Sequence, residues 1–305
     1  MTRKVPGTFR VPIPQTLEEA SVARPIGVNT WVWTSPLTDE RLAALAPRVR
    51  DWGFDVIELP VEDPDDWDPD RAADLLGPLG LGATVSLVMG DGRELVATDP
   101  ATVASTQDYL RRVVDAAAVV GATVIGGPAY ASVGRTWRLS AEERVAAYAE
   151  LAANLAPVVS YAAERGVKVG VEALNRYETS LLNTVEQTLE AVAPLPVEGC
   201  GLMLDVYHMN IEETSVPAAI EQAGERIVHV QVCGNQRGTP GDDHLDWPGI
   251  FAALDATGYD GPICIESFTG DNATIATAAS IWRPLAPSQD ALAVDGLAFL
   301  RPFCT

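Results

Sequence analysis

The chain has few basic side chains and very few histidines for its length. Among 305 residues there are 21 Lys and Arg and 3 His against 42 Asp and Glu, so the formal net charge at pH 7 is -21. A protein with this charge repels the phosphate backbone of nucleic acids and the headgroups of anionic lipids. We therefore expect neither nucleic acid nor a membrane surface as a partner.

The sequence also lacks long apolar runs and any metal-binding spacing of cysteines. No segment approaches roughly 18 uninterrupted apolar residues, the length expected of a membrane span. The N-terminal stretch MTRKVPGTFRVPIPQ has no apolar core of a signal peptide. No CxxC spacing occurs among the four cysteines, which are Cys200, Cys233, Cys264 and Cys304. These absences predict a cytoplasmic protein with reduced thiols.

Short apolar runs alternate with longer amphipathic stretches along most of the chain. The eight apolar runs are residues 26–33, 54–60, 81–88, 122–128, 167–174, 201–208, 227–234 and 261–268. Eight repeats of strand and helix favour one closed parallel (β/α)₈ TIM barrel over an open doubly wound sheet, which usually stops at about five to seven strands. We expect a leader segment at 1–24 and a single barrel domain at 25–305.

The last four apolar runs each end in a side chain whose oxygen can act as a ligand atom. In VKVGVE, the aliphatic residues share one face and Glu172 ends the other, and Asp205, Gln231 and Glu266 hold the equivalent place in the next three runs. The β-branched face must pack against the helices, so the other face points into the barrel. Because the carboxyl ends of the strands meet at one mouth of a TIM barrel, the four oxygen donors are predicted to converge there.

The seventh run, IVHVQVCG, is unusual because it puts a carboxamide inside the barrel. Val228, Val230 and Val232 are predicted to face the helices, which leaves His229 and Gln231 on the inner face. A buried amide without partners costs about 1–3 kcal/mol. Gln231 must therefore either satisfy a core hydrogen bond or hold a ligand, whereas His229 is predicted to be an interior hydrogen-bonding residue.

Three carboxylates at one barrel mouth repel each other unless they are protonated or bridged by a cation. A divalent cation resolves this conflict and also uses the amide oxygen. The predicted metal ligands are Glu172, Asp205, Gln231 and Glu266. Such hard oxygen ligands favour Mn²⁺ first, with Mg²⁺ or Co²⁺ as alternatives.

Candidate substrate contacts lie near the same strand ends. Glu178 and His208 fall just beyond Glu172 and Asp205. Arg237, in GNQRG, could neutralise a substrate oxygen or pair with neighbouring acids. Trp33 and Trp31, at the end of the first apolar run, could stack on the apolar face of a sugar or fill the core.

At these residues the sequence resembles the ketose 3-epimerases, the D-tagatose and D-psicose 3-epimerase group of the xylose-isomerase-like TIM barrels. The resemblance runs from Ile26 to Arg301 and is carried by blocks such as GPAYASVG, VEALNRYE and LDVYHMNIEE. It implies an isomerase that inverts carbon 3 of a ketose through an enediolate, with a divalent metal as cofactor and a small sugar as substrate.

The resemblance also implies roles for individual residues. Glu172 and Glu266 would be the catalytic acid/base pair and metal ligands, and Asp205 a further metal ligand. Glu178, His208 and Arg237 would contact substrate oxygens. The family carries His-x-His where this chain has His229-Val230-Gln231, so Gln231 replaces the family's histidine ligand. Hydroxypyruvate-isomerase-like barrels resemble this chain in having a glutamine there.

Other functions fit parts of this pattern. The barrel and metal site also resemble the catalytic subunit of a C-glycoside deglycosidase, which would form a hetero-complex with a small β-rich subunit, whereas an epimerase is expected to be a homo-oligomer. A hydroxypyruvate-isomerase-like aldose–ketose isomerase and a non-catalytic sugar-binding barrel are further alternatives. No glycine-rich phosphate cradle accompanies Arg135 and Arg138, which favours an unphosphorylated substrate.

Overall fold

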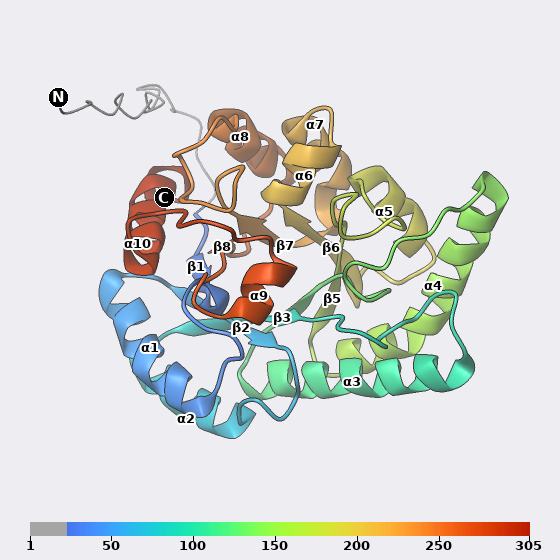
Figure 1. Ribbon diagram of the computed structural model, residues 1–305, viewed down its shortest axis with the longest axis horizontal. Coiled ribbons are helices and arrows are strands. Elements are labelled where there is room, and N and C mark those ends of the chain that lie inside the picture. Colours follow the sequence, from blue (N-terminus) through green and yellow to red (C-terminus); the bar gives the residue numbers. More distant parts are fainter. Residues whose placement is uncertain (1–22) are drawn as a thin grey trace.

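The computed structural model describes residues 23–305. The predicted leader at 1–24 therefore lies outside the described residues, except for its last two positions. Eight parallel strands close into a barrel in sequence order, with β8 paired to β1, and helices surround them (Figure 1). The predicted single (β/α)₈ barrel is confirmed.

The strands are β1 (Ile26–Asn29), β2 (Val56–Val61), β3 (Gly82–Leu87), β4 (Val124–Gly127), β5 (Lys168–Glu172), β6 (Cys200–Asp205), β7 (Ile227–Val232) and β8 (Ile263–Ile265). The α-helices are α1 (Asp39–Trp52), α2 (Pro69–Leu79), α3 (Pro100–Val119), α4 (Ala141–Ala163), α5 (Val185–Val192), α6 (Val206–Glu212), α7 (Val216–Ala223), α8 (Trp247–Thr257), α9 (Ala273–Ala278) and α10 (Gln289–Leu300). Three short 3₁₀ helices, η1 (Thr30–Val32), η2 (Gly224–Arg226) and η3 (Arg301–Phe303), complete the described elements.

Side-chain caps fix where the long outer helices begin. Ser140 and Glu143 form a reciprocal capping box at the start of α4. Asp99 accepts hydrogen bonds from two backbone N–H groups of the first turn of α3, and Pro100 occupies the first helical position, where no N–H is needed. No helix among residues 23–305 is long and apolar enough to cross a membrane.

The predicted alternation of faces holds for β5, β6 and β8. Val169 and Val171, Leu202 and Leu204, and Ile263 and Ile265 are buried in the main core cluster. The opposite faces of β4, β5 and β6 carry glycines, which leave room inside the barrel for larger residues from neighbouring strands. A Cβ on Gly126, for example, would overlap the sulfur of Met203.

The prediction for Val228 is wrong. The β6–β7 register shifts at Leu202/Met203, so that Ile227 pairs with Leu202 and His229 pairs with Met203, which leaves Val228 as the extra residue of a bulge. A Cβ on Gly201 would overlap Val228 Cγ1, and one on Gly170 would lie 3.1 Å from Cγ2. Val228 therefore fills the space above two inward-facing glycines instead of facing the helices.

Candidate active site

Three buried carboxylates meet at the carboxyl ends of the strands. Glu172 ends β5, Asp205 ends β6 and Glu266 directly follows β8, and each is at most 5% exposed. Arg237 joins two of them, because its Nη1 donates to Asp205 Oδ2 and to Glu266 Oε2, both at 2.7 Å. The predicted convergence of these residues is therefore present in the structure.

A strained turn places Arg237 between the acids. Arg237 has a φ of 66°, in the left-handed region that a bulky residue rarely adopts. Its N–H donates to the carbonyl of Gly234, whose own N–H donates to Gly238, which closes a tight turn after β7. Strain of this kind concentrates at functional sites. The turn aims the guanidinium at Asp205 and Glu266 and over the Tyr207 ring, 3.9 Å from its centroid.

The carboxylates carry more negative charge than one guanidinium can balance. Burial raises the pKa of Glu172 well above its usual range, and the charges of Glu266 and Asp205 raise it further. Burial also raises the pKa of Glu266, to about 8, even though Arg237 opposes that rise. The cluster therefore either retains protons at neutral pH or gains a cation.

Gln231 offers this site an unused oxygen. It is fully buried on β7 and pairs in register with Asp205 on β6. Its Nε2 donates to Glu58 Oε2 at 2.5 Å, whereas its Oε1 is buried with no hydrogen-bond partner among residues 23–305. A buried amide oxygen without a partner is costly, and ligation of a cation would satisfy it. The residues present thus fit a divalent cation held by oxygen donors.

His208 lies beside the same carboxylates but is suited to donate a hydrogen bond and not to bind a metal. Glu172, Asp205 and His208 have ligand atoms within 4.8 Å of one another. His208 Nδ1 accepts the backbone N–H of Asn175 at 3.0 Å. Burial lowers the pKa of His208, so the ring is neutral, and its single proton then belongs on Nε2. Arg237 Nη2 lies 3.1 Å from Nε2, but a neutral ring can accept only one donor, and the Asn175 N–H at 3.0 Å is the one fixed by the backbone. A protonated Nε2 donates a hydrogen bond and cannot also bind a metal.

A cavity of about 140 Å³ lies against this cluster. One wall is polar and contains Glu172, Glu178, His208, Arg237 and Glu266. Apolar side chains also line the cavity, with Trp31 and Phe268 stacked at a centroid distance of 5.4 Å and with Ile275, Ala278 and Ala279 from the α9 region. In Figure 1, α9 lies in front of the strands. A small polyhydroxy compound, polar at its oxygens and apolar on its C–H faces, suits such a cavity.

The structure brings three of the four predicted substrate contacts to the cavity. Glu178, His208 and Arg237 line it, and Trp33 does not. The Trp33 ring instead stacks on Trp52 at 5.6 Å, and its Nε1 donates to Asp290. Trp31 lines the cavity in its place, because η1 turns the chain directly after β1.

Sequence reasoning missed Glu58, which holds the Gln231 amide. It lies in the middle of β2 and is fully buried. The signal was available, because GFDVIELP places a single carboxylate inside an otherwise apolar strand, just as IVHVQVCG places a single carboxamide. The strand-end pattern that marks Glu172, Asp205 and Gln231 does not include Glu58, because it lies three residues before the end of β2.

The fold and the site define a xylose isomerase-like TIM barrel, and the family model of that description matches residues 46–303. A ketose 3-epimerase of Arthrobacter globiformis is 33% identical over 90% of this chain and 95% of its own length. An L-ribulose 3-epimerase of Mesorhizobium japonicum is 33% identical over 90% and 92%. The crystal structure of the Methylomonas D-allulose 3-epimerase in complex with D-allulose superposes with a TM-score of 0.84 at 30% identity, covering 92% of this chain and 97% of that one. The chain belongs to the ketose 3-epimerase family.

Proposed function

We propose that the protein is an isomerase that inverts carbon 3 of a free ketose with the help of a divalent cation. The observation that carries this proposal is the pair Glu172 and Glu266, which line one cavity. In the closed strand order β6 and β7 separate β5 from β8, so the two carboxyl groups reach the cavity from different directions. Two bases on different sides of one carbon are what inversion requires.

The predicted ligand set, Glu172, Asp205, Gln231 and Glu266, would hold the cation. When bound, a divalent cation acts as a Lewis acid on the oxygens of the sugar. Removal of the carbon-3 proton by one carboxylate leaves an enediolate. The proton on His208 Nε2 and the Arg237 guanidinium can donate to its oxygens. The second carboxyl group then returns a proton to the other face of carbon 3.

The finer assignments are proposals of the same kind. Mn²⁺ is proposed because the donors are hard oxygens. An unphosphorylated sugar is proposed because Arg135 is occupied by Glu94 and by the carbonyls of Val96 and Ala97.

A cytoplasmic location is proposed because Cys200, Cys233, Cys264 and Cys304 are all free and buried. We also propose a leader segment at 1–24 before the barrel unit at 25–305. A homo-oligomer is a further proposal, and light scattering would measure its mass in solution.

The relatives found are epimerases, so the comparisons do not favour a C-glycoside deglycosidase or an aldose–ketose isomerase. If a small β-rich subunit co-purified with the chain and were needed for turnover, that would reverse this preference.

The test is exchange of the carbon-3 hydrogen with solvent. Metal-stripped protein is incubated in D₂O with Mn²⁺ and with L-ribulose, D-allulose or D-fructose in turn, and NMR follows deuterium at carbon 3 together with the appearance of the 3-epimer. We expect both signals for at least one ketose, and their loss in EDTA. Absence of both signals for every ketose in the presence of bound Mn²⁺ would overturn the proposal.

A further inference from the structure

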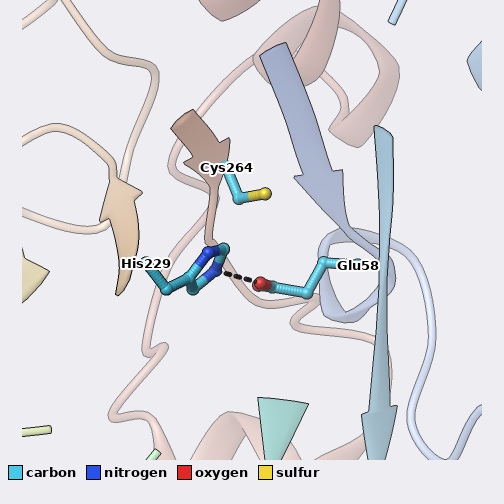
Figure 2. Close-up of side chains that lie close together, drawn as sticks. All are labelled: Glu58, His229 and Cys264. Carbon is cyan, nitrogen blue, oxygen red and sulfur yellow. Dashed lines mark hydrogen bonds and ion pairs between the residues drawn. The ribbon is translucent and has the colours of Figure 1, made fainter. Parts of the chain in front are cut away.

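A second polar cluster lies inside the barrel, away from the cavity. Glu58 on β2, His229 on β7 and Cys264 on β8 point toward one another (Figure 2). Each is at most 1% exposed, and none of them lines the cavity. His229 precedes Gln231 by two residues on the same strand, so the cluster lies directly behind the proposed cation site.

Hydrogen-bond donors surround the Glu58 carboxylate. Its Oε1 accepts from Thr84 Oγ1 at 3.1 Å and contacts His229 Nε2, and its Oε2 accepts from Asn29 Nδ2 at 2.8 Å and from Gln231 Nε2 at 2.5 Å. Both Glu58 oxygens thus accept hydrogen bonds, and Oε2 accepts from two N–H donors, so the group acts as an acceptor toward its neighbours.

The cluster is poorly suited to bind a metal ion of its own. Both Glu58 oxygens are already used by donors, and His229 Nε2 contacts one of them directly. Burial raises the pKa of Cys264 well above its usual range, so its sulfur stays a thiol, and the thiolate is the form that ligates metals. The hydrogen bonds therefore act on the side chains around Glu58, and one of those side chains is Gln231.

We infer that Glu58 is a positioning residue that turns the Gln231 amide so that its oxygen faces the cation site. The two ends of a carboxamide have nearly the same size, so packing cannot choose between the two orientations. Glu58 can choose, because its oxygens already act as acceptors, so it accepts from Nε2 and repels Oε1. With Nε2 held by Glu58, Oε1 is left without a partner among the described residues.

This orientation has to be imposed because the active site itself favours the opposite one. Asp205 pairs in register with Gln231, and Glu172 and Glu266 lie at the same end of the barrel. In the metal-free protein the Asp205 carboxylate attracts an NH₂ group and repels a carbonyl oxygen. Without Glu58, the amide would turn its nitrogen toward Asp205 and offer the cation no lone pair. The inference rests on the proposed function, since it assumes a cation at this site.

The test is the affinity of metal-stripped protein for Mn²⁺, measured by titration calorimetry and by the EPR signal of free Mn²⁺. Glu58→Gln keeps the shape but removes the requirement that Gln231 donate, and we expect its Kd for Mn²⁺ to rise about 10–100-fold, as for other residues that orient metal ligands. Thr84→Val is the matched control, because it removes a donor from the other Glu58 oxygen and leaves the contact with Gln231 intact. Its Kd should stay within about threefold of the wild-type value.

The outcomes separate the two claims. If wild-type protein binds no stoichiometric Mn²⁺, the proposed function fails. If wild-type binds Mn²⁺ and folded Glu58→Gln binds it equally tightly, the positioning role alone is wrong. Should Glu58→Gln not fold, the exchanged pair Glu58→Gln/Gln231→Glu restores a donor–acceptor contact and again leaves an oxygen toward the cation. Binding by this pair that is tighter than, or within about tenfold of, the wild-type value supports the inference, and weaker binding overturns it.

Discussion

Glu172 and Glu266 are distinguished by having almost no solvent around their charge. Both are 5% exposed, and the pKa of each is raised by burial. A carboxylate in such a place is a stronger base than one at the surface, and its conjugate acid still holds a proton near neutral pH. These shifts belong to the metal-free protein, because a bound cation would lower both pKa values. The proposed proton transfer depends on the two carboxyl groups themselves.

Amide substitutions test this directly. Glu172→Gln and Glu266→Gln each keep the shape and remove the proton carrier, so we expect kcat to fall by about 10²–10⁴-fold and carbon-3 deuterium exchange to fall with it. Glu164→Gln is the control, because its side chain is 76% exposed. Wild-type exchange rates in both active-site variants would show that neither carboxyl group moves the proton.

Substitution of Arg237 tests how the charges of Asp205 and Glu266 are neutralised when no metal is present. Arg237→Met leaves Asp205 and Glu266 without their shared cation, so in EDTA we expect a loss of about 3–5 kcal/mol in the free energy of unfolding. Saturating Mn²⁺ should reduce that loss, because the metal replaces the missing charge. Arg112→Met, which breaks an ion pair with Asp65 in which the two side chains are 52% and 81% exposed, should cost no more than about 1 kcal/mol with or without metal. Urea unfolding measures all four values, and a loss at Arg237 that Mn²⁺ does not change would contradict this account.

At the scale of the element, the sequence was most informative where helices cover the strands. In β5, β6 and β8 the outer face must be aliphatic, so alternation alone placed Glu172, Asp205 and Glu266 at the mouth. The bulge in β7 could not be seen in this way, because it depends on space left by glycines of two other strands. For Arg237 the sequence left open whether it would neutralise a substrate oxygen or pair with neighbouring acids, because its position depends on a loop residue with positive φ, and the structure shows the pairing with Asp205 and Glu266.

The glycines inside the barrel provide the test at this scale. A Cβ on Gly201 would overlap Val228 Cγ1 and lie 2.5 Å from the carbonyl of Arg226, so Gly201→Ala should cost at least about 1–3 kcal/mol of stability. Gly77 lies within α2 with nothing within 4 Å of such a Cβ, so Gly77→Ala should stabilise the protein by about 0.5–1 kcal/mol. Thermal unfolding compares the two variants, and equal effects would show that the space above Gly201 is not needed for Val228.

At the scale of the whole molecule, two buried acids with opposite pKa shifts define the pH range of stability. Glu58 has a pKa of about 2 in the folded protein, below its ordinary value, so its stabilising contribution is present above about pH 4.5 and is lost as pH falls toward 2. Glu266 has a pKa of about 8, so folding favours its protonated form, and stability falls as pH rises from about 4.5 to 8. The net charge of -21 adds repulsion in the same upper range. We expect the metal-free protein to be most stable near pH 5 by urea unfolding, and a shallower decline above that pH in Glu266→Gln.

Metal binding should reverse that decline, because a cation takes the place of the protons that the site would otherwise retain. At pH 8, Mn²⁺ at about 100 times its Kd should add about 2.7 kcal/mol and raise the Tm by roughly 5 °C. At pH 5.5 the same Mn²⁺ concentration must displace protons from Glu172 and Glu266, so binding is weaker and the increase in Tm should be clearly smaller. Scanning calorimetry with EDTA or Mn²⁺ at the two pH values measures this difference. An equal increase at both would show that the cation does not replace protons on these carboxyl groups and binds elsewhere.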